Sequence, residues 1–288
     1  MKDLNYQLKA LCRNNRDGSH ATREIRERLL SQMADQLYAL GYRRLGAHSL
    51  KPKHVEALVS LWKDQGLTIG TVKNRLAVLR WWAAKVNKAS VVARDNHAYG
   101  IGERHYVAET SKAQDLDPRK LARIKDPCIR LSLRLQAEFG LRREEAIKFA
   151  PRYAVRQDHI CLKASWTKGG RARSVPITRD SQRTLLEEIQ QFVGGGALIP
   201  PHRNYVQQLR FYERQTKAAE LKKLHGLRHA YAQRRYRELT GWPAPVAGGP
   251  ARKALGPEQR AIDEEARATL TSELGHSRLD VTKSYLGR

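Results

Sequence analysis

Residues 224–239 read LHGLRHAYAQRRYREL, a segment of helical character that opens on the pentapeptide HGLRH. Three other short segments in the second half of the chain carry reactive side chains: GLRREE at 140–145, WTKGG at 166–170 and LGH at 274–276. Tyr285 follows the last of these by nine positions. Taken singly, each segment has an ordinary explanation, because a charged side chain after a helix or in a turn is usually solvated. The question is therefore whether the four segments form one set.

The charge balance narrows the class of partner. Fifty-four Lys and Arg residues oppose 29 Asp and Glu, which gives a formal net charge of +25. Such an excess attracts polyanions, and DNA is the commonest polyanion inside cells. A solubility surface needs only a modest net charge, and no continuous basic amphipathic helix stands out as a membrane anchor. The composition therefore predicts a nucleic-acid-binding protein.

Cysteine usage and the start of the chain bear on the compartment. Cys12, Cys128 and Cys161 lie far apart, are odd in number and include no CxxC pair, so they predict neither a disulfide framework nor a zinc site. The opening MKDLNYQLKALCRNN lacks the apolar core of a signal peptide. No stretch approaches the roughly 18 apolar residues of a membrane span. A soluble, cytoplasmic protein with no membrane partner is expected.

The first hundred residues have the periodicity of helices. We expect one helix from about Ile25 with Gly41 as its C-terminal cap, a second from about Pro52, and a third from about Thr68. The expected buried positions are Leu29, Met33, Leu37 and Leu40 in the first, Val55, Leu58, Val59 and Trp62 in the second, and Ile69, Val72, Leu76, Leu79, Ala83 and Val86 in the third.

The third helix carries polar residues on its other face. Lys73, Asn74, Arg75 and Arg80 are predicted to bind DNA, because a helix packed inward can lay its basic face along a phosphate backbone. An ordinary solvated face is an equal alternative for this helix.

The rest of the chain combines helices with one hairpin. Periodicity fails from Arg94 to Asp117, which indicates a linker, and Asp117-Pro118 restarts a helix that ends near Gly140. The segments HICLKAS (159–165) and RSVPI (173–177) predict two strands joined through Gly169 and Gly170. Further helices are expected at 178–193, 203–220 and 224–239. Residues 241–258 hold four prolines and four glycines and predict an irregular insertion.

As an ordered set, the four segments resemble the catalytic domain of the tyrosine recombinases. The motif GLRxxE, a hairpin Lys, HxLRH, LGH and a terminal Tyr occur in the family's order with similar spacing, over residues 117–288. A weaker similarity to the family's helical core-binding domain covers about 20–95. The resemblance implies a mainly α (α+β) protein. Its expected parts are a helical core-DNA-binding domain at 1–95, a linker at 96–116, and a mainly helical catalytic domain at 117–288 with a small antiparallel sheet and an irregular insertion at about 240–260.

Phosphodiester chemistry explains why arginines belong in such a set. The reaction concentrates negative charge on the phosphate oxygens, and guanidinium groups hold these oxygens through paired hydrogen bonds while staying protonated. The resemblance assigns this clamp to Arg142 and Arg228, with Glu145 supporting the architecture of the site. Arg143 adjoins Arg142, and the family's register favours Arg142.

The resemblance also assigns the proton transfers. Tyr285 is the nucleophile, and because a phenol has a pKa of about 10 it needs a base, for which His225 is the candidate. Lys168 would protonate the departing 5′ oxygen, and His276 would hydrogen-bond the scissile phosphate. His229 is expected to be structural. Arg234, Arg235 and Arg237 are expected to form a solvated or DNA-facing surface.

Two features depart from the family's pattern. The insertion between Tyr236 and Glu264 separates HxLRH and LGH more widely than usual; it is either a loop that contacts DNA or a partner, or an inert excursion. The chain ends at Leu286-Gly287-Arg288, directly after the tyrosine, whereas many relatives continue into a helix that couples subunits in a tetramer. We therefore expect the usual cyclic coupling to be missing or moved.

The function implied is site-specific cleavage and rejoining of double-stranded DNA through a 3′-phosphotyrosyl intermediate, in integration or excision of a mobile element or in multimer resolution. No cofactor or metal is expected. The partners implied beyond DNA are further copies in a tetrameric synapse and an accessory directionality factor. The absence of an extra amino-terminal arm-binding domain disfavours assembly of the lambda-integrase type. The alternatives are a catalytically silent DNA-binding protein of the same fold and a type IB topoisomerase-like enzyme; an HUH relaxase would need a histidine metal cluster, which the sequence does not show.

Overall fold

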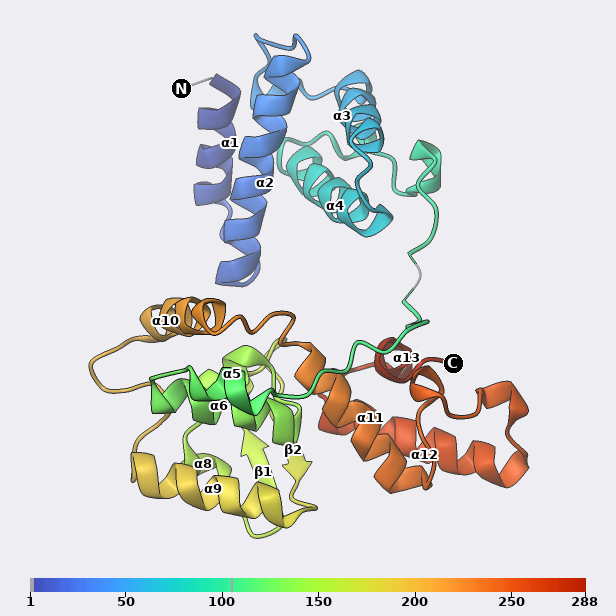
Figure 1. The fold of residues 1–288 in the computed structure, drawn as a ribbon. Coiled ribbons are helices and arrows are strands. Elements are labelled where there is room, and N and C mark those ends of the chain that lie inside the picture. Colours follow the sequence, from blue (N-terminus) through green and yellow to red (C-terminus); the bar gives the residue numbers. More distant parts are fainter. Residues whose placement is uncertain (1–2, 105) are drawn as a thin grey trace. The chain divides into compact units, whose positions relative to one another are not determined.

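The computed structural model describes residues 3–104 and 106–288 and divides the chain into two compact units, Met1–His105 and Tyr106–Arg288. Nearly all regular structure is helical, and the described residues hold a single two-stranded sheet, in the second unit (Figure 1). The mainly α class with a small antiparallel sheet, expected from the sequence, is confirmed. Residues 106–116, part of the expected linker, fall in the second unit: the Ala108 amide donates to the Lys283 carbonyl and the Gln114 amide to the Gly226 carbonyl.

Within residues 3–104, the first unit is built from four α-helices: α1 (Asp3–Asn14), α2 (His20–Ala39), α3 (Pro52–Asp64) and α4 (Ile69–Lys85). Thr68 caps α4 by accepting a hydrogen bond from the Thr71 amide, as its hydroxyl favours. All four apolar positions expected on α3 are buried, and Trp62 and Trp82 fill the centre of the unit. At the helix ends the expectation fails: Leu40 and Ile69 are exposed, because each lies where a helix leaves the core.

The predicted DNA-binding face of α4 needs a correction. Arg75 does not face outward: it is buried, its guanidinium lies 5.2 Å from the Trp62 ring centroid, and its Nη2 donates to Gln32. The apolar stem of an arginine can pack in such a place, although the buried Nε and Nη1 of Arg75 have no hydrogen-bond partner among the described residues. Arg80 donates hydrogen bonds from Nε to the Ala93 carbonyl and from Nη2 to the side-chain oxygen of Asn96. Lys73 is half-buried and Asn74 is exposed.

The second unit contains nine α-helical elements within its described residues. They are α5 (Pro118–Ala122), α6 (Pro127–Phe139), α7 (Arg143–Ile147), α8 (Pro151–Ala154), α9 (Asp180–Val193), α10 (Tyr205–Ala218), α11 (Gly226–Thr240), α12 (Pro257–Glu273) and α13 (Lys283–Leu286). The single helix expected after Asp117 is two helices. A second Asp-Pro pair restarts the chain at Asp126-Pro127, where the Asp126 carboxylate accepts from the Ile129 amide.

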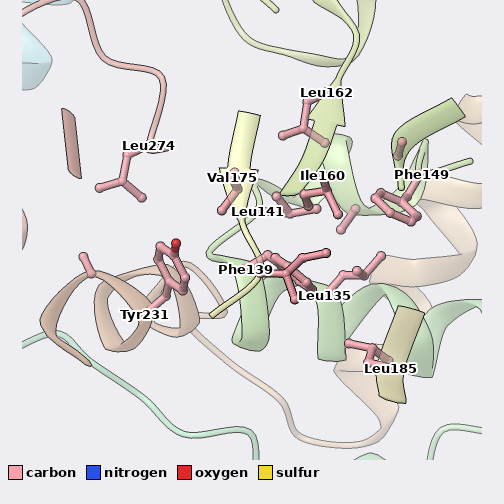
Figure 2. Close-up of a cluster of buried hydrophobic side chains, with 14 of the residues drawn as sticks. Leu135, Phe139, Leu141, Phe149, Ile160, Leu162, Val175, Leu185, Tyr231 and Leu274 are labelled. Atoms are coloured by element: carbon pink, nitrogen blue, oxygen red, sulfur yellow. The ribbon is translucent and has the colours of Figure 1, made fainter. Parts of the chain in front are cut away.

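The expected hairpin is present, with shorter strands. β1 (His159–Leu162) pairs antiparallel with β2 (Arg173–Pro176), and Ile160 lies opposite Val175. Figure 2 shows these two side chains meeting the core that α6 contributes through Leu135 and Phe139. The sheet is thereby fixed to the helical body, and the connection between its strands, which carries Lys168, projects from a rigid base.

The insertion between α11 and α12 is irregular, as predicted, and its first part is packed. It contains two short 3₁₀ turns, Pro245–Ala247 and Arg252–Ala254. Ala244 is fully buried, and Val246 packs against the cluster that includes Tyr285 and Leu286. This part of the insertion therefore supports the segment that carries the predicted nucleophile and is not an inert excursion.

The cysteines and the apolar segments bear on the expected compartment of the protein. Cys12, Cys128 and Cys161 are all free thiols; Cys128 is buried, and the other two are half-buried. Among the helices of the described ranges, none combines the length and the apolar character needed to cross a membrane.

Candidate active site

The site forms around the C-terminal end of α12. The last carbonyls of a helix have no amide partner within it and carry the negative end of its dipole, so they attract cations. Here the Glu273 carbonyl accepts from Arg173 Nε at 2.8 Å, and the Leu274 carbonyl accepts from Arg142 Nη2 at 3.2 Å and from Arg228 Nη2. Three arginines that are distant in sequence are thus brought together at one helix end.

Arg228 is almost completely buried, on the first turn of α11. Its Nη1 donates to the Gly140 carbonyl at 2.5 Å, and its Nε lies 3.4 Å from the Tyr285 hydroxyl. Gly140 has φ +61°, and a Cβ there would lie 2.5 Å from the Tyr231 ring, so only glycine suits this turn. Burial lowers the pKa of Arg228 to about 10, which still leaves the guanidinium charged at neutral pH.

Arg142 lies at the start of α7, where Glu145 fixes it from one turn away. The Glu145 carboxylate accepts from the Arg142 amide at 2.7 Å and from its Nη1 at 2.9 Å. Arg142 keeps part of its side chain accessible, whereas Glu145 is buried. The neighbouring Arg143 instead pairs with Glu213 on the surface. Of the two adjacent arginines, Arg142 is therefore the one that enters the site.

Arg173 is a member of the site that the sequence analysis missed. It is the first residue of β2, its side chain is buried, and its Nη1 and Nη2 reach the two Glu145 oxygens at 2.6 and 2.7 Å. Burial alone would raise the pKa of Glu145, but hydrogen bonds and charge from Arg173, with smaller contributions from Arg228 and the Arg142 amide, lower it to about 2. The segment RSVPI was assigned as a strand, and its alternation places Arg173 on the same face as the buried Val175. That signal could have shown that the arginine turns inward, but not that it meets Glu145.

Tyr285 lies on α13 among three imidazole rings. Its ring centroid is 4.5 Å from that of His229, 5.7 Å from His276 and 6.1 Å from His225. Gln233 also donates to the Tyr285 carbonyl at 3.0 Å. The structure therefore brings together five of the six predicted catalytic residues with the supporting Glu145, and it adds His229, whose ring is the nearest of the three to that of the predicted nucleophile.

Lys168 is the predicted catalytic residue that stands apart. It is exposed at the tip of the hairpin, next to Gly169 and Gly170, and no hydrogen bond or ion pair of its ammonium group occurs within residues 106–288. Thr167 steadies the tip by donating to the Ala164 and Arg171 carbonyls.

The basic face predicted on α11 is largely occupied by internal contacts. Arg234 donates to the Ala137 carbonyl, and Arg235 pairs with Glu273 at 3.1 Å, so neither forms the expected solvated surface. Arg237 is exposed. Within the described ranges no group of three or more His, Cys, Asp or Glu side chains is placed to hold a metal ion.

The pKa values of the three histidines around Tyr285 are all lowered, which favours the neutral form of each imidazole. Burial is the main cause in each case, reinforced by nearby cations such as Arg228; it lowers the pKa of His229 and His276 to about 4 and also lowers the pKa of His225. A neutral imidazole near Tyr285 can accept the phenolic proton, which is the state a general base requires.

These shifts predict how stability depends on pH. The pKa of each histidine is lower in the folded state than its unfolded value of about 6.5, so the unfolded chain binds more protons below pH 6.5. The free energy of unfolding should therefore be greatest above pH 7 and decrease as the pH falls from 7 towards 5. Calorimetric melting of the free protein at pH 7, 6 and 5 measures this effect, and His229→Asn should show a shallower decline. A melting temperature that stays constant or rises over this interval contradicts the expectation.

Two family models match this chain. The model for the N-terminal region of phage integrases matches residues 1–90, and the integrase model matches residues 102–234. A search of curated proteins finds no match to the sequence.

Solved structures share the fold across nearly the whole chain. A lambda integrase dimer bound to a core site is 14% identical with a TM-score of 0.62, covering 99% of this chain and 77% of that one. XerH recombinase bound to a palindromic difH substrate is 17% identical with a TM-score of 0.57, covering 98% and 80%. The Tn1549 transposon integrase in complex with transposon right-end DNA is 14% identical with a TM-score of 0.54, covering 99% and 95%. The two family models together span both units, and the chain belongs to the tyrosine recombinase family, that of the phage integrases.

Proposed function

We propose that this chain is a site-specific DNA recombinase that cleaves and rejoins double-stranded DNA through a covalent bond between Tyr285 and a 3′ phosphate, in integration or excision of a mobile element. The observation that carries the proposal is the position of Tyr285: its hydroxyl lies 3.4 Å from Arg228 Nε, and the rings of three histidines lie around its own ring. A phenol in this setting has a base for its proton and a cation for the charge that develops during attack.

The reaction proceeds by in-line exchange at phosphorus. The Tyr285 oxygen forms a bond to phosphorus and gives its proton to an imidazole, for which His225 is the candidate. Arg142 and Arg228 hold the non-bridging oxygens, and the bond from phosphorus to the 5′ oxygen breaks as Lys168 supplies a proton. Attack by a 5′ hydroxyl of another strand reverses the sequence. One phosphoester replaces another at each step, so no external energy source is needed.

The proposed substrate is duplex DNA held by several copies of the chain. The net charge of +25 favours a polyanion, and a lambda integrase of the same fold has been solved as a tetramer bound to a Holliday junction. We propose that strand exchange likewise occurs between copies assembled on DNA, in the cytoplasm, with an accessory factor setting direction. DNA affinity should depend steeply on salt concentration because phosphate contacts release counterions.

Covalent trapping tests the proposed function directly. The purified protein is incubated with sheared DNA from its source locus and with supercoiled plasmid carrying that locus, then denatured. DNA attached to protein is recovered and its 3′ ends are sequenced. Attachment at one recurrent sequence supports the proposal, and transfer of a strand to a second duplex separates it from a topoisomerase-like activity. Salt-sensitive binding without attachment, also on a nicked duplex that carries the bound site, would assign the chain to the catalytically silent class.

Lys168→Ala should slow cleavage by about 10²-fold to 10⁴-fold, the usual contribution of a proton donor. The defect should nearly disappear on a substrate whose 5′ bridging oxygen is replaced by sulfur, because a thiol has a pKa of about 8.5 and leaves without a proton. Single-turnover rates on both substrates measure this effect, with Lys163→Ala as a control lysine from the same hairpin. An equal loss on both substrates would rule out Lys168 as the acid.

A further inference from the structure

We infer that Arg173 is a positioning residue for catalysis: through Glu145 it holds the Arg142 guanidinium in the orientation that receives the scissile phosphate. This inference rests on the proposed function, in which Arg142 and Arg228 hold the phosphate oxygens. It goes beyond that function by naming the residue that orients Arg142.

The first step of the argument is the hydrogen bonding of Glu145. Each of its oxygens accepts two hydrogen bonds: Oε1 from Arg173 Nη1 and Arg142 Nη1, and Oε2 from Arg173 Nη2 and the Arg142 amide. Glu145 is 1% exposed, so no water competes for these positions. A carboxylate saturated in this way has one orientation, and the orientation of Arg142 follows from it.

The second step concerns what keeps Arg173 in place. Its backbone belongs to the β1–β2 ladder, where Arg173 lies opposite Leu162, and its Nε donates to the Glu273 carbonyl at 2.8 Å. Its stem passes over Gly275, where an added Cβ would lie 2.8 Å from Arg173 Cδ and where φ is +64°. The side chain is thus fixed by the sheet, by a helix end and by a glycine that leaves it room.

The third step is the division of roles among the arginines. Three of the five guanidinium N–H groups of Arg173 donate to Glu145 and Glu273, and its side chain is 6% exposed. Arg228 is buried as well, but its Nε lies 3.4 Å from the Tyr285 hydroxyl, whereas none of these hydrogen bonds of Arg173 involves Tyr285. Arg142 is partly accessible, and its Nε and one hydrogen on each Nη nitrogen have no partner among the described residues. Arg142 therefore contacts the phosphate, and Arg173 acts through Glu145.

The experiment compares variants on two substrates. Arg173→Met removes the fork and the charge while keeping the length of the stem, and Arg173→Lys keeps the charge but cannot occupy both oxygens. Arg142→Ala reports loss of the clamp itself. The matched control is Arg203→Met, because Arg203 also pairs with a largely buried carboxylate, Asp126, away from the site. One substrate is the intact duplex that the wild-type protein cleaves, with an ordinary phosphodiester at the scissile position. The other is the same duplex with an uncharged methylphosphonate at that position.

We expect Arg173→Met to lower the single-turnover cleavage rate of the phosphodiester by about 10²-fold to 10³-fold, as for loss of one preorganised contact to the reacting group. Arg173→Lys should fall between Arg173→Met and the wild type. On the methylphosphonate the Arg173→Met defect should shrink at least about tenfold, in parallel with that of Arg142→Ala, because the charge met by the clamp is absent. Arg203→Met should cleave both substrates at the wild-type rate even if it melts earlier.

Three outcomes are decisive. An Arg173→Met defect that is equal on both substrates, while Arg142→Ala is rescued by the methylphosphonate, overturns the inference and leaves the proposed function intact. Failure of Arg142→Ala to be rescued contradicts the clamp itself. If the wild type does not cleave, the proposed function fails, and a crystal structure of Arg173→Met still tests the inference: Arg142 should have left Glu145 and the Leu274 carbonyl, and an unmoved Arg142 refutes it.

Discussion

Changing Tyr285 to phenylalanine is expected to abolish covalent attachment to DNA while DNA binding stays at the wild-type level. The substitution removes one oxygen and leaves the ring packed between His229 and the rest of the core. Loss of a covalent nucleophile typically costs about 10⁴-fold to 10⁶-fold in rate, which puts the remaining reaction below detection. The measurement is the fraction of protein joined to a 3′ DNA end after denaturation, with the dissociation constant for the same duplex measured in parallel.

A matched control separates this effect from general loss of a buried hydroxyl. Tyr212 is also buried, and its hydroxyl accepts from Gln136 Nε2 at 2.9 Å rather than from any of the predicted catalytic residues. Tyr212→Phe should cleave normally and lose only about 1 kcal/mol of stability, the usual net contribution of one hydrogen bond. Cleavage by Tyr285→Phe would show that another residue is the nucleophile.

The second large effect is expected at Arg228. Arg228→Lys keeps a positive charge but loses the planar fork that reaches the Gly140 and Leu274 carbonyls and the Tyr285 hydroxyl together. We expect single-turnover cleavage to decrease by about 10³-fold, the upper range for one preorganised charge-stabilising group. DNA affinity should change little, because the many other phosphate contacts remain.

Stability must be measured beside activity for this variant, since Arg228 is also part of the core. Two main-chain carbonyls would lose a buried donor. The Leu274 carbonyl would keep Arg142 Nη2, and an unsatisfied Gly140 carbonyl would cost about 1–3 kcal/mol. Rates are therefore compared at a temperature where melting curves show every variant folded. A rate for Arg228→Lys within tenfold of the wild type, under those conditions, would remove Arg228 from the clamp.

Much of the site was predictable because its residues lie in short motifs. Arg142, Glu145, His225, Arg228, His276 and Tyr285 were all identified from sequence, and the structure gathers them at one place. Their assigned roles remain predictions. Arg173 was not identified, because it lies outside these motifs. The alternation of a strand shows on which face a side chain lies, but not which group it contacts there.

The failures elsewhere have physical causes of the same kind. Arg75 was placed on an outward face because arginine is usually exposed, yet Trp62 offers it a ring to stack on within the first unit. The single helix expected from Asp117 onward is interrupted before Asp126-Pro127. This dipeptide starts a new helix in the same way as Asp117-Pro118, nine residues earlier, starts the first one. In each case a tertiary partner or a second local signal outweighed the periodicity of the segment.

The end of α12 has a consequence for how this protein can diverge. Its three arginines are anchored on carbonyl oxygens of Glu273 and Leu274, and every amino acid supplies that atom. The anchor itself therefore does not depend on which side chains stand at these two positions, so long as the last turn of the helix ends at the same point in space; the buried side chains of α12, such as Asp263 and Leu270, are constrained separately by their packing. Insertions ahead of Pro257 are tolerable for the same reason, whereas a deletion of one residue inside α12 would rotate the anchor away. A comparison of homologues by residue identity would not detect this anchor, because the carbonyl oxygens that hold the arginines belong to the main chain.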